Sequence, residues 1–110
     1  MKISFKSNKL KKQLTDPREM TKAFGARAQK VNQRMKDLRA VVTLEDMQTI
    51  PAARCHELKG DRNGQLAVNV SGNYRLVFMP DHDPLPLKED TGLNWKLVTD
   101  IVVIEVEDYH

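Results

Sequence analysis

The strongest hydrophobic pattern of the chain lies close to its C-terminal end. Residues 101–104 are four consecutive apolar, β-branched side chains, and such a run is typical of a strand buried on both faces. Because side chains alternate between the two faces of a strand, one face is predicted to carry five residues: Val102, Ile104, Val106, Asp108 and His110. Tyr109 should point to the other face unless the strand bulges. The alternative is that the last polar residues form only a frayed tail.

Alternation of apolar and polar residues also predicts strands in the middle of the chain. Residues 65–70 and 74–78 alternate, and Ser71-Gly72-Asn73 between them forms a tight reversal, which together predict a β-hairpin. Three further segments are predicted to be strands: 2–6, 55–58 and 95–106. Residues 80–93 are rich in proline and acidic side chains and are predicted to form a long loop.

A helix-start signal precedes a stripe of apolar residues that are three or four positions apart. Asp16 suits the N-cap and Pro17 suits the first helical position, and Ser7 or Asn8 can cap a shorter helix upstream. The stripe predicts one helix of roughly six turns and consists of Met20, Phe24, Ala28, Val31, Met35, Leu38 and Val42. The whole pattern predicts a single α+β domain over residues 1–110. In it, an N-terminal strand and a basic helical hairpin pack on a small antiparallel sheet.

Charge is distributed unevenly along the chain. Residues 1–40 contain twelve Lys or Arg and three Asp or Glu, a balance of +9, whereas residues 41–110 contain six and twelve, a balance of −6, and the two sum to +3. A basic half suggests a polyanionic partner such as RNA or DNA. Lys22, Lys30 and Arg34 lie largely off the apolar stripe, so they are predicted to be exposed and to bind nucleic acid. The alternative is a solvated helix face without a ligand.

Length and composition narrow the class of protein further. The longest apolar run is four residues and the first twelve residues lack the apolar core of a signal peptide, so we expect a cytoplasmic protein without a membrane span. The single cysteine, Cys55, cannot form an internal disulfide. A metal site would have to draw on six residues: Cys55, His56, His82, Asp83, Asp108 and His110. None of their spacings is a recognised ligand pattern, so no metal or other cofactor is predicted.

Three segments of the chain belong together as motifs: ISFKSNKLKK near the start, CHELKGDRNGQLAVNVSGNYRLVF in the centre, and VEDYH at the end. Together they resemble the HigB-type toxins of the RelE/ParE superfamily of toxin–antitoxin systems, over nearly the whole length. The resemblance implies a RelE-like fold and an endoribonuclease that enters the ribosomal A site beside 16S rRNA, cleaves mRNA and arrests growth. It also implies a HigA-type helix-turn-helix antitoxin, in a complex such as a heterotetramer. The loop 80–93 departs from the shorter hairpin expected in this family.

Seven positions match functional positions of that family: His56, Lys59, Asn73, Arg75, Asp108, Tyr109 and His110. Such a set can support metal-free RNA cleavage, in which a base removes the 2′-OH proton, an acid protonates the leaving 5′ oxygen, and cations stabilise the phosphate. Either histidine can be base or acid because imidazole titrates near neutral pH. Asp108 can act as a base or orient a histidine.

The remaining matched residues would bind the substrate. Arg75 and Lys59 would hold the phosphate, Tyr109 would stack on a base or donate a hydrogen bond, and Asn73 would contact the RNA. A different class of function stays open, because the same scaffold hosts non-catalytic binders. In that case the chain would be a ParE-like gyrase-binding toxin or a nucleic-acid-binding module.

Overall fold

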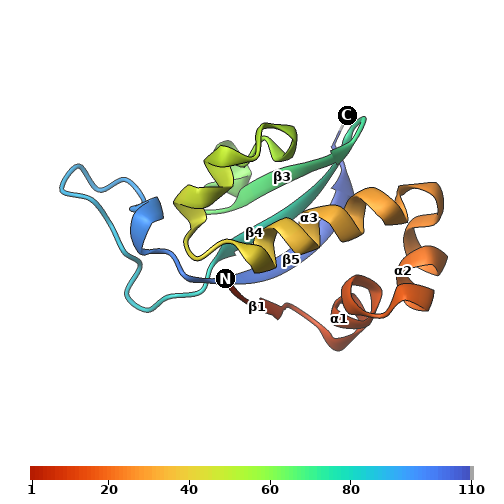
Figure 1. The fold of residues 1–110 in the computed structure, drawn as a ribbon. Coiled ribbons are helices and arrows are strands. Elements are labelled where there is room, and N and C mark those ends of the chain that lie inside the picture. Colours follow the sequence, from red (N-terminus) through yellow and green to blue (C-terminus); the bar gives the residue numbers. More distant parts are fainter. Residues whose placement is uncertain (110) are drawn as a thin grey trace.

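The computed structural model describes residues 1–109, and at its centre is a five-stranded sheet with the order β1-β5-β4-β3-β2 (Figure 1). The strands are β1 (Lys2–Phe5), β2 (His56–Glu57), β3 (Leu66–Ser71), β4 (Tyr74–Pro80) and β5 (Asp100–Asp108). The helices are α1 (Asn8–Thr15), α2 (Pro17–Phe24) and α3 (Ala28–Ala40). Short 3₁₀ turns occupy Gly25–Arg27, Leu44–Thr49, Pro51–Ala53, Gly60–Arg62 and Trp95–Leu97. Among the described helices, none is both long and apolar enough to span a membrane.

The sheet joins the two ends of the chain. Strands β2 to β5 pair antiparallel, and β1 adds to the edge of β5 in parallel, with Lys2 opposite Asp100 and Phe5 opposite Val103. The predicted α+β class and the central position of the C-terminal strand are confirmed. The parallel pairing of β1 was not predicted, because hydrophobic alternation within a strand contains no information about the direction of its neighbour.

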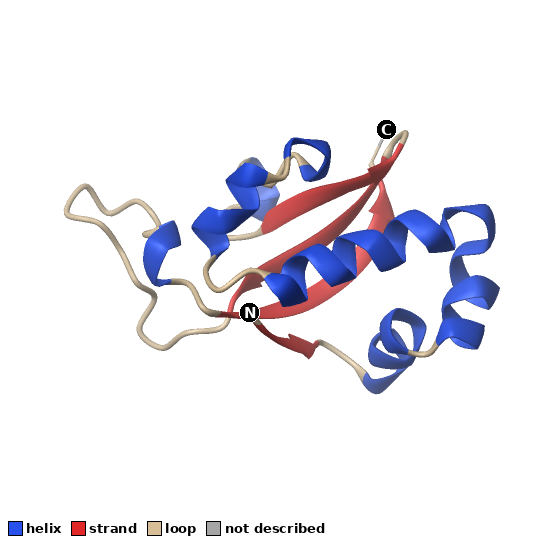
Figure 2. Cartoon of the chain, viewed as in Figure 1, coloured by secondary structure: helices blue, strands red, loops and turns tan. Residues whose placement is uncertain are grey.

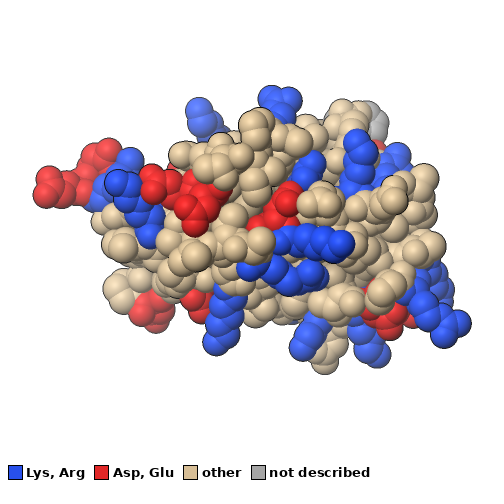
Figure 3. All heavy atoms as spheres, in the orientation of Figure 1, with Lys and Arg blue, Asp and Glu red and all other residues tan. Residues whose placement is uncertain are grey.

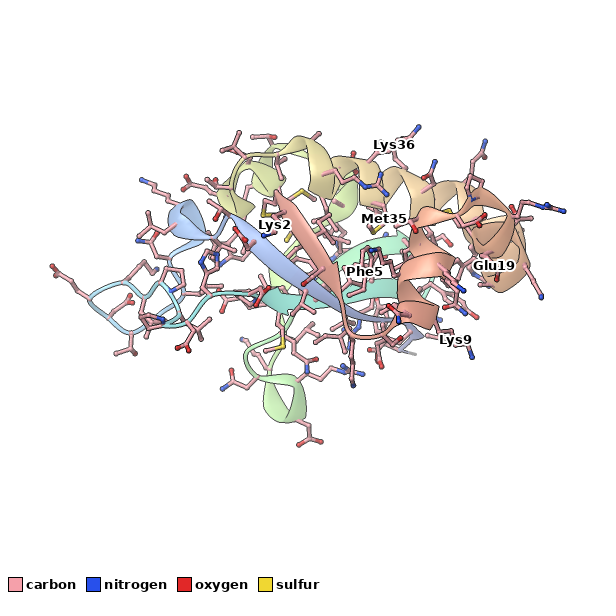
Figure 4. All side chains as sticks on the ribbon, turned by 90° about the horizontal axis from the view of Figure 1, so that it is seen from below. Lys2, Phe5, Lys9, Glu19, Met35 and Lys36 are labelled. Atoms are coloured by element: carbon pink, nitrogen blue, oxygen red, sulfur yellow. The ribbon has the colours of Figure 1, made fainter. Side chains whose placement is uncertain are left out.

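Helices α1, α2 and α3 cover one face of the sheet, which we call the helix face (Figures 1 and 2). Figure 4 shows Met35 pointing from α3 towards the sheet, whereas Lys36 points away from it. The core between the two layers includes fully buried residues from both: Leu14, Val31, Met35 and Leu38 from helices, and Leu66, Val68, Leu76, Phe78, Ile101 and Val103 from strands. Burying one such large side chain stabilises a fold by about 1.5–3 kcal/mol.

The opposite face of the sheet, which we call the open face, carries a much smaller apolar cluster. Leu58, Ala67 and Val77 are buried there, and the half-buried Ile104 packs against them. Cross-strand pairing explains the grouping, because Ala67 on β3 lies opposite Val77 on β4. Polar and charged side chains occupy the positions beside this cluster, and these form the candidate site described below.

The prediction of one helix of six turns is wrong, because α2 and α3 are separate. Gly25 ends α2 with φ +54°, a left-handed conformation that glycine adopts without steric cost, and its N–H bonds to Thr21 O. The apolar stripe nevertheless continues across the break, since both helices pack on the same core. The predicted cap of α2 is confirmed: the Asp16 carboxylate accepts two backbone N–H groups of the first turn.

The predicted exposure of Arg34 is also wrong. Its residue surface is only 9% exposed, and its Nε donates to the backbone carbonyl of Asn69 on β3 at 2.8 Å. Its Nη1 forms an ion pair of 2.7 Å with Asp37, one turn further along α3. Arg34 therefore ties α3 to the sheet instead of facing solvent. Position relative to an apolar stripe could not reveal this, because a long side chain at the edge of the stripe can turn inwards when it finds a buried acceptor.

The loop predicted at residues 80–93 is observed at 81–94, because Pro80 still belongs to β4, and the return strand starts later than expected. Trp95–Leu97 is a 3₁₀ turn and β5 begins only at Asp100, so the predicted strand start at Trp95 is wrong. The Trp95 indole N–H donates to Glu57 at 3.0 Å, which holds the turn against β2. The loop is fastened at its base by His82, whose Nε2 accepts the backbone N–H groups of Thr99 and Asp100.

Candidate active site

A bulge in β5 decides which of its last residues reach the open face. The register between β4 and β5 shifts by one residue between Val77 and Phe78, which makes Ile104 an extra residue on β5. Ile104 and Glu105 therefore both lie on the open face, and alternation resumes with Val106 on the helix face.

The bulge reverses the predicted faces at the end of the chain. The prediction that Val102 and Ile104 share a face with Val106 and Asp108 is wrong, because the extra residue lies between the two pairs. Tyr109 lies on the open face together with Ile104, which is the outcome expected if the strand bulges. Its backbone N–H donates to the carbonyl of Asn73 in the β3–β4 turn at 3.0 Å.

Tyr109 helps to line a small pocket of about 110 Å³ on the open face. The lining residues come from the segment before β2, from β2, β3 and β4, and from the end of β5: Arg54, His56, Asn69, Arg75 and Tyr109. The ladder brings them together, since Asn69 on β3 pairs with Arg75 on β4, and β2 lies along β3. Two cations, an imidazole, an amide and a phenol thus surround one concavity that could hold a phosphate and an adjacent base.

The orientation of His56 is set by the residue two positions before it. Its Nδ1 lies 2.7 Å from the carbonyl oxygen of Arg54. A carbonyl only accepts, so Nδ1 is the protonated nitrogen and Nε2 is the nitrogen that remains for a substrate. Arg54 itself adopts a left-handed backbone conformation, φ 45° and ψ 50°, which a non-glycine residue rarely takes and which occurs often at functional sites.

A network of charged side chains lies beside the pocket and holds Arg75. The Nε and Nη2 of Arg75 contact Glu107 Oε1 at 2.8 and 2.6 Å. The other oxygen of Glu107, Oε2, accepts from Arg62 Nη2, which also pairs with Glu105. The Tyr109 ring stacks on the Arg75 guanidinium, 4.3 Å from its carbon to the ring centroid. Arg75 is thereby held by a carboxylate and by an aromatic face.

The same contacts determine the charge state of Glu107. Burial raises the pKa of this carboxyl, but hydrogen bonds with Glu105 and Arg75 and the positive charges of Arg75 and Arg62 outweigh it. The pKa therefore lies below the ordinary value of 4.5. Glu107 is consequently ionised at neutral pH, and it remains a strong acceptor for both arginines.

The structure brings three of the predicted site residues together, namely His56, Arg75 and Tyr109. Lys59 is exposed at the start of the 3₁₀ turn Gly60–Arg62, outside the pocket lining. Asn73 lies in the hairpin turn and contributes its carbonyl, through the bond to Tyr109.

The other predicted residues lie elsewhere. Asp108 is opposite Tyr74, a residue that packs against the core, and so its register position is on the helix face. His110 lies outside the described residues. Lys22 on α2 and Lys30 on α3 are exposed as predicted. Figure 3 shows Lys and Arg spread over the helical part of the molecule, whereas acidic residues gather towards the end formed by the loop 81–94.

Sequence comparison identifies the family of this chain. A family model described as the RelE-like toxin of the type II toxin–antitoxin system HigB matches residues 3–83, most of the chain. The chain belongs to this family. The resemblance of its motifs to HigB-type toxins is thereby confirmed, and the match includes His56, Arg75 and the β3–β4 hairpin that supports the pocket.

Two solved structures share the fold of this HigB-like toxin over its whole length. A YoeB/ParE toxin from Agrobacterium tumefaciens has a TM-score of 0.55 and 15% identity, covering 100% of each chain. A YoeB–YefM complex from Staphylococcus aureus has a TM-score of 0.51 and 15% identity, covering 100% of this chain and 97% of that chain. The comparison confirms the RelE-like α+β fold, and at this identity it concerns the fold alone. A search of curated proteins found no match.

Four residues of the site of this HigB-like toxin were missed by reading the sequence: Arg54, Arg62, Asn69 and Glu107. Alternation could have found part of this set. Every second residue of a strand lies on the same face, and residues that pair across two strands share a face as well. Asn69 on β3 pairs with Arg75 on β4, so the two side chains lie on one face. Arg54 and Arg62 lie in irregular segments, and no periodic pattern could indicate where their side chains or carbonyls point.

The rival metal site gains no support from the geometry. Within residues 1–109, no three His, Cys, Asp or Glu side chains lie close enough together to hold a metal ion. The Nε2 of His82, one of the candidate ligands, instead accepts backbone N–H groups of Thr99 and Asp100. Burial, together with the negative charge of Glu57, raises the pKa of the Cys55 thiol to about 12, so Cys55 is neither a ready ligand nor a nucleophile at neutral pH.

Proposed function

We propose that this HigB-like toxin is a ribosome-dependent endoribonuclease that cleaves mRNA in the A site and so stops translation and growth. The observation that supports the proposal most strongly is the pocket on the open face, where His56, Arg54 and Arg75 surround a concavity beside the Tyr109 ring. Such a set provides a proton carrier, cations for a phosphate and a surface on which a base can stack.

The proposed reaction needs no metal or cofactor. The 2′ oxygen attacks the adjacent phosphorus, the bond to the 5′ oxygen breaks, and the products are a 2′,3′-cyclic phosphate and a 5′-OH. Through Nε2, His56 either removes the proton of the 2′-OH or gives a proton to the leaving 5′ oxygen. The Arg54 carbonyl accepts from Nδ1–H of His56 and so fixes the orientation of the ring. Arg75 and Arg54 hold the phosphate oxygens as negative charge develops there.

Other residues are assigned roles on the basis of the family resemblance. We propose His110 as the second proton carrier and Asp108 as the group that orients or deprotonates. Lys59 would be an additional phosphate contact, and Asn73 would contact the RNA. These roles await the same cleavage assay as the pocket residues.

The partners follow from the charge distribution and from the family. The exposed Lys22 and Lys30 would bind 16S rRNA around the A site. We propose a HigA-type helix-turn-helix antitoxin as the protein partner, in an assembly such as a heterotetramer, and action in the cytoplasm. The related fold of the Staphylococcus aureus toxin, which was solved as a YoeB–YefM complex, supports pairing with an antitoxin.

Toeprinting on purified ribosomes that translate a defined mRNA tests the reaction. The unaltered protein should produce new RNA ends within the A-site codon. His56→Ala should lower the cleavage rate by roughly two to four orders of magnitude, the usual range for losing an acid or base. Arg75→Ala should lower it by about two to three orders, the range for losing a donor to a developing negative charge.

Matched variants outside the pocket serve as controls. His82→Ala removes a histidine of the loop, and Arg39→Ala removes an exposed arginine of α3. Both should cleave at close to the parental rate. If the parent protein produces no new RNA ends but inhibits supercoiling by purified gyrase, the non-catalytic ParE-like function replaces the nuclease.

Chelation distinguishes the side-chain mechanism from a metal-dependent one. 1,10-Phenanthroline binds zinc and leaves the magnesium that ribosomes require. Cleavage should continue unchanged in its presence. Loss of cleavage, with recovery when zinc is added back, would revive the metal site.

A further inference from the structure

We propose that Glu107 is a positioning residue of the site, which is held by Arg62 and in turn fixes the Arg75 guanidinium so that its free edge faces the scissile phosphate. This inference rests on the proposed nuclease function. It assigns a role to two residues, Glu107 and Arg62, that are outside the pocket lining and outside the set predicted from the family.

The two oxygens of Glu107 are divided between two arginines. Oε1 accepts from Nε and Nη2 of Arg75, at 2.8 and 2.6 Å, and Oε2 accepts from Nη2 of Arg62. Arg62 is itself held, because its Nη1 donates to Gln65 Oε1 at 2.8 Å. Both oxygens of the carboxylate are therefore engaged. Because Arg62 restrains the carboxylate, the carboxylate in turn restrains the Arg75 guanidinium.

The contacts select which edge of Arg75 is left for a ligand. Glu107 occupies the Nε/Nη2 edge, and Tyr109 covers one face of the guanidinium, with 4.3 Å between the guanidinium carbon and the ring centroid. In the contacts of residues 1–109, the N–H groups on Nη1 of Arg75 have no protein acceptor, and Arg75 lines the pocket. A planar guanidinium that is anchored along one edge keeps little rotational freedom, so its remaining donors are pre-organised for a phosphate.

The negative charge of Glu107 is essential for this arrangement. The side chains of Arg75 and Glu107 are only 16% and 17% exposed, so water cannot replace the lost partner fully. An amide at position 107 would keep the size of the side chain. However, it offers one oxygen in place of two, and its NH₂ group would face one of the arginines.

Glu105 provides a matched control on the same strand and on the same face. It pairs with Arg62 but not with Arg75, according to the contacts of the described residues. Glu105→Gln alters a neighbour that also hydrogen-bonds with Glu107, but it keeps both contacts between Arg75 and Glu107 Oε1. A role in stability alone would make the two substitutions similar, whereas a positioning role makes them differ.

The cleavage test compares both variants on translating ribosomes. Glu107→Gln should lower kcat by about 10- to 100-fold, a range expected when a catalytic group is misplaced by about an ångström. Glu105→Gln should change kcat less than about threefold. In the Arg75→Ala background, Glu107→Gln should produce no further loss, because the group that it positions is already absent. Circular dichroism and thermal unfolding establish that each variant is folded.

A second measurement does not depend on catalysis. The Nε–H signal of Arg75 in ¹⁵N NMR should be sharp and slow to exchange in the parent and in Glu105→Gln, and fast-exchanging in Glu107→Gln. An ordered signal in folded Glu107→Gln would overturn the proposal, and so would equal loss of cleavage in both variants. If the parent does not cleave RNA at all, the proposed function fails. The NMR result then still decides whether Glu107 orders Arg75.

Discussion

The two faces of the sheet differ in composition although the same strands form both. One face carries the main apolar core, and the other carries the polar pocket beside a small apolar cluster. On the helix face, β3, β4 and β5 present fully buried apolar residues such as Phe78 and Val103 to the helices. On the open face, the same strands present Asn69, Arg75 and Glu107 beside a small apolar cluster. Because neighbouring residues of a strand point to opposite faces, a change on one face need not disturb the other. The fold can therefore separate stability from chemistry residue by residue.

Two arginines illustrate the difference between the faces. Arg34 belongs to α3, and its side chain lies between this helix and the sheet. It donates to the Asn69 carbonyl and pairs with Asp37, so these contacts are internal to the fold. Arg75, on β4, lies opposite Asn69 of β3 and lines a pocket that is open to solvent. Both arginines are held by a carboxylate, but of the two it is Arg75 that lines a pocket where a ligand can bind. Burial of a cation thus indicates function only when part of it remains accessible.

The largest difference between the faces should appear in stability. Phe78→Ala removes a fully buried ring from the main core and should lower the free energy of unfolding by about 3–5 kcal/mol. Ile104→Ala, at the half-buried bulge of the open face, should cost less, about 1–2 kcal/mol. Urea denaturation followed by circular dichroism measures both. Equal losses would mean that the open face contributes to the core as much as the helix face does.

Arg34 should behave as part of the fold and not as part of the substrate surface. Arg34→Ala leaves Asp37 and the Asn69 carbonyl without their partner and should lower the free energy of unfolding by about 2–4 kcal/mol. Arg39→Ala, on the exposed side of the same helix, should change it by less than about 0.5 kcal/mol. Thermal unfolding of the two variants provides the comparison. A stable Arg34→Ala protein with weakened ribosome binding would contradict the assignment.

The exposed lysines of the helices test whether substrate binding extends beyond the open face. Lys22→Glu combined with Lys30→Glu should weaken ribosome binding and reduce the slope of log affinity against log salt by roughly one to two, the range expected for losing two phosphate contacts. Both residues are exposed, so unfolding should change little. Lys88→Glu in the acidic loop is the control and should leave the slope unchanged. An unaltered slope in the double variant would restrict RNA binding to the pocket.

The smallest expected effect is a pH dependence from the open face. The pKa of Glu107 is lowered from 4.5 in the folded protein, so the folded state favours the ionised carboxylate. Its contribution to stability should be complete above the ordinary pKa and should be lost as the pH falls below 4.5 through the lowered value. Denaturation at pH 7 and at lower pH should show a smaller acid-induced loss in Glu107→Gln than in the parent. Parallel pH profiles would mean that Glu107 has no such linkage.

The sequence by itself determined the strands and the helical region, but neither the break between α2 and α3 nor the start of β5. Apolar periodicity placed the hairpin and the central C-terminal strand. The chemistry of single residues placed the caps, because Asp16 and Ser7 act through hydrogen bonds to backbone groups a few positions away. These interactions are local in the chain, so they can be read without the fold. Three motifs, at residues 3–12, 55–78 and 106–110, together indicated the family.

The tertiary structure alone decided which residues meet. The bulge at Ile104 moved Tyr109 to the face of His56, and a bulge depends on the register with a neighbouring strand, which alternation within one strand does not contain. Arg34 turned inwards because a carbonyl distant in sequence needed a donor. Glu107 bridges Arg62 and Arg75 because strand pairing and the turn Gly60–Arg62 bring these two residues, which are distant from it in sequence, next to its carboxylate. Each of these outcomes depends on contacts between segments far apart in the chain, and such contacts are decided by packing, after the local patterns have been satisfied.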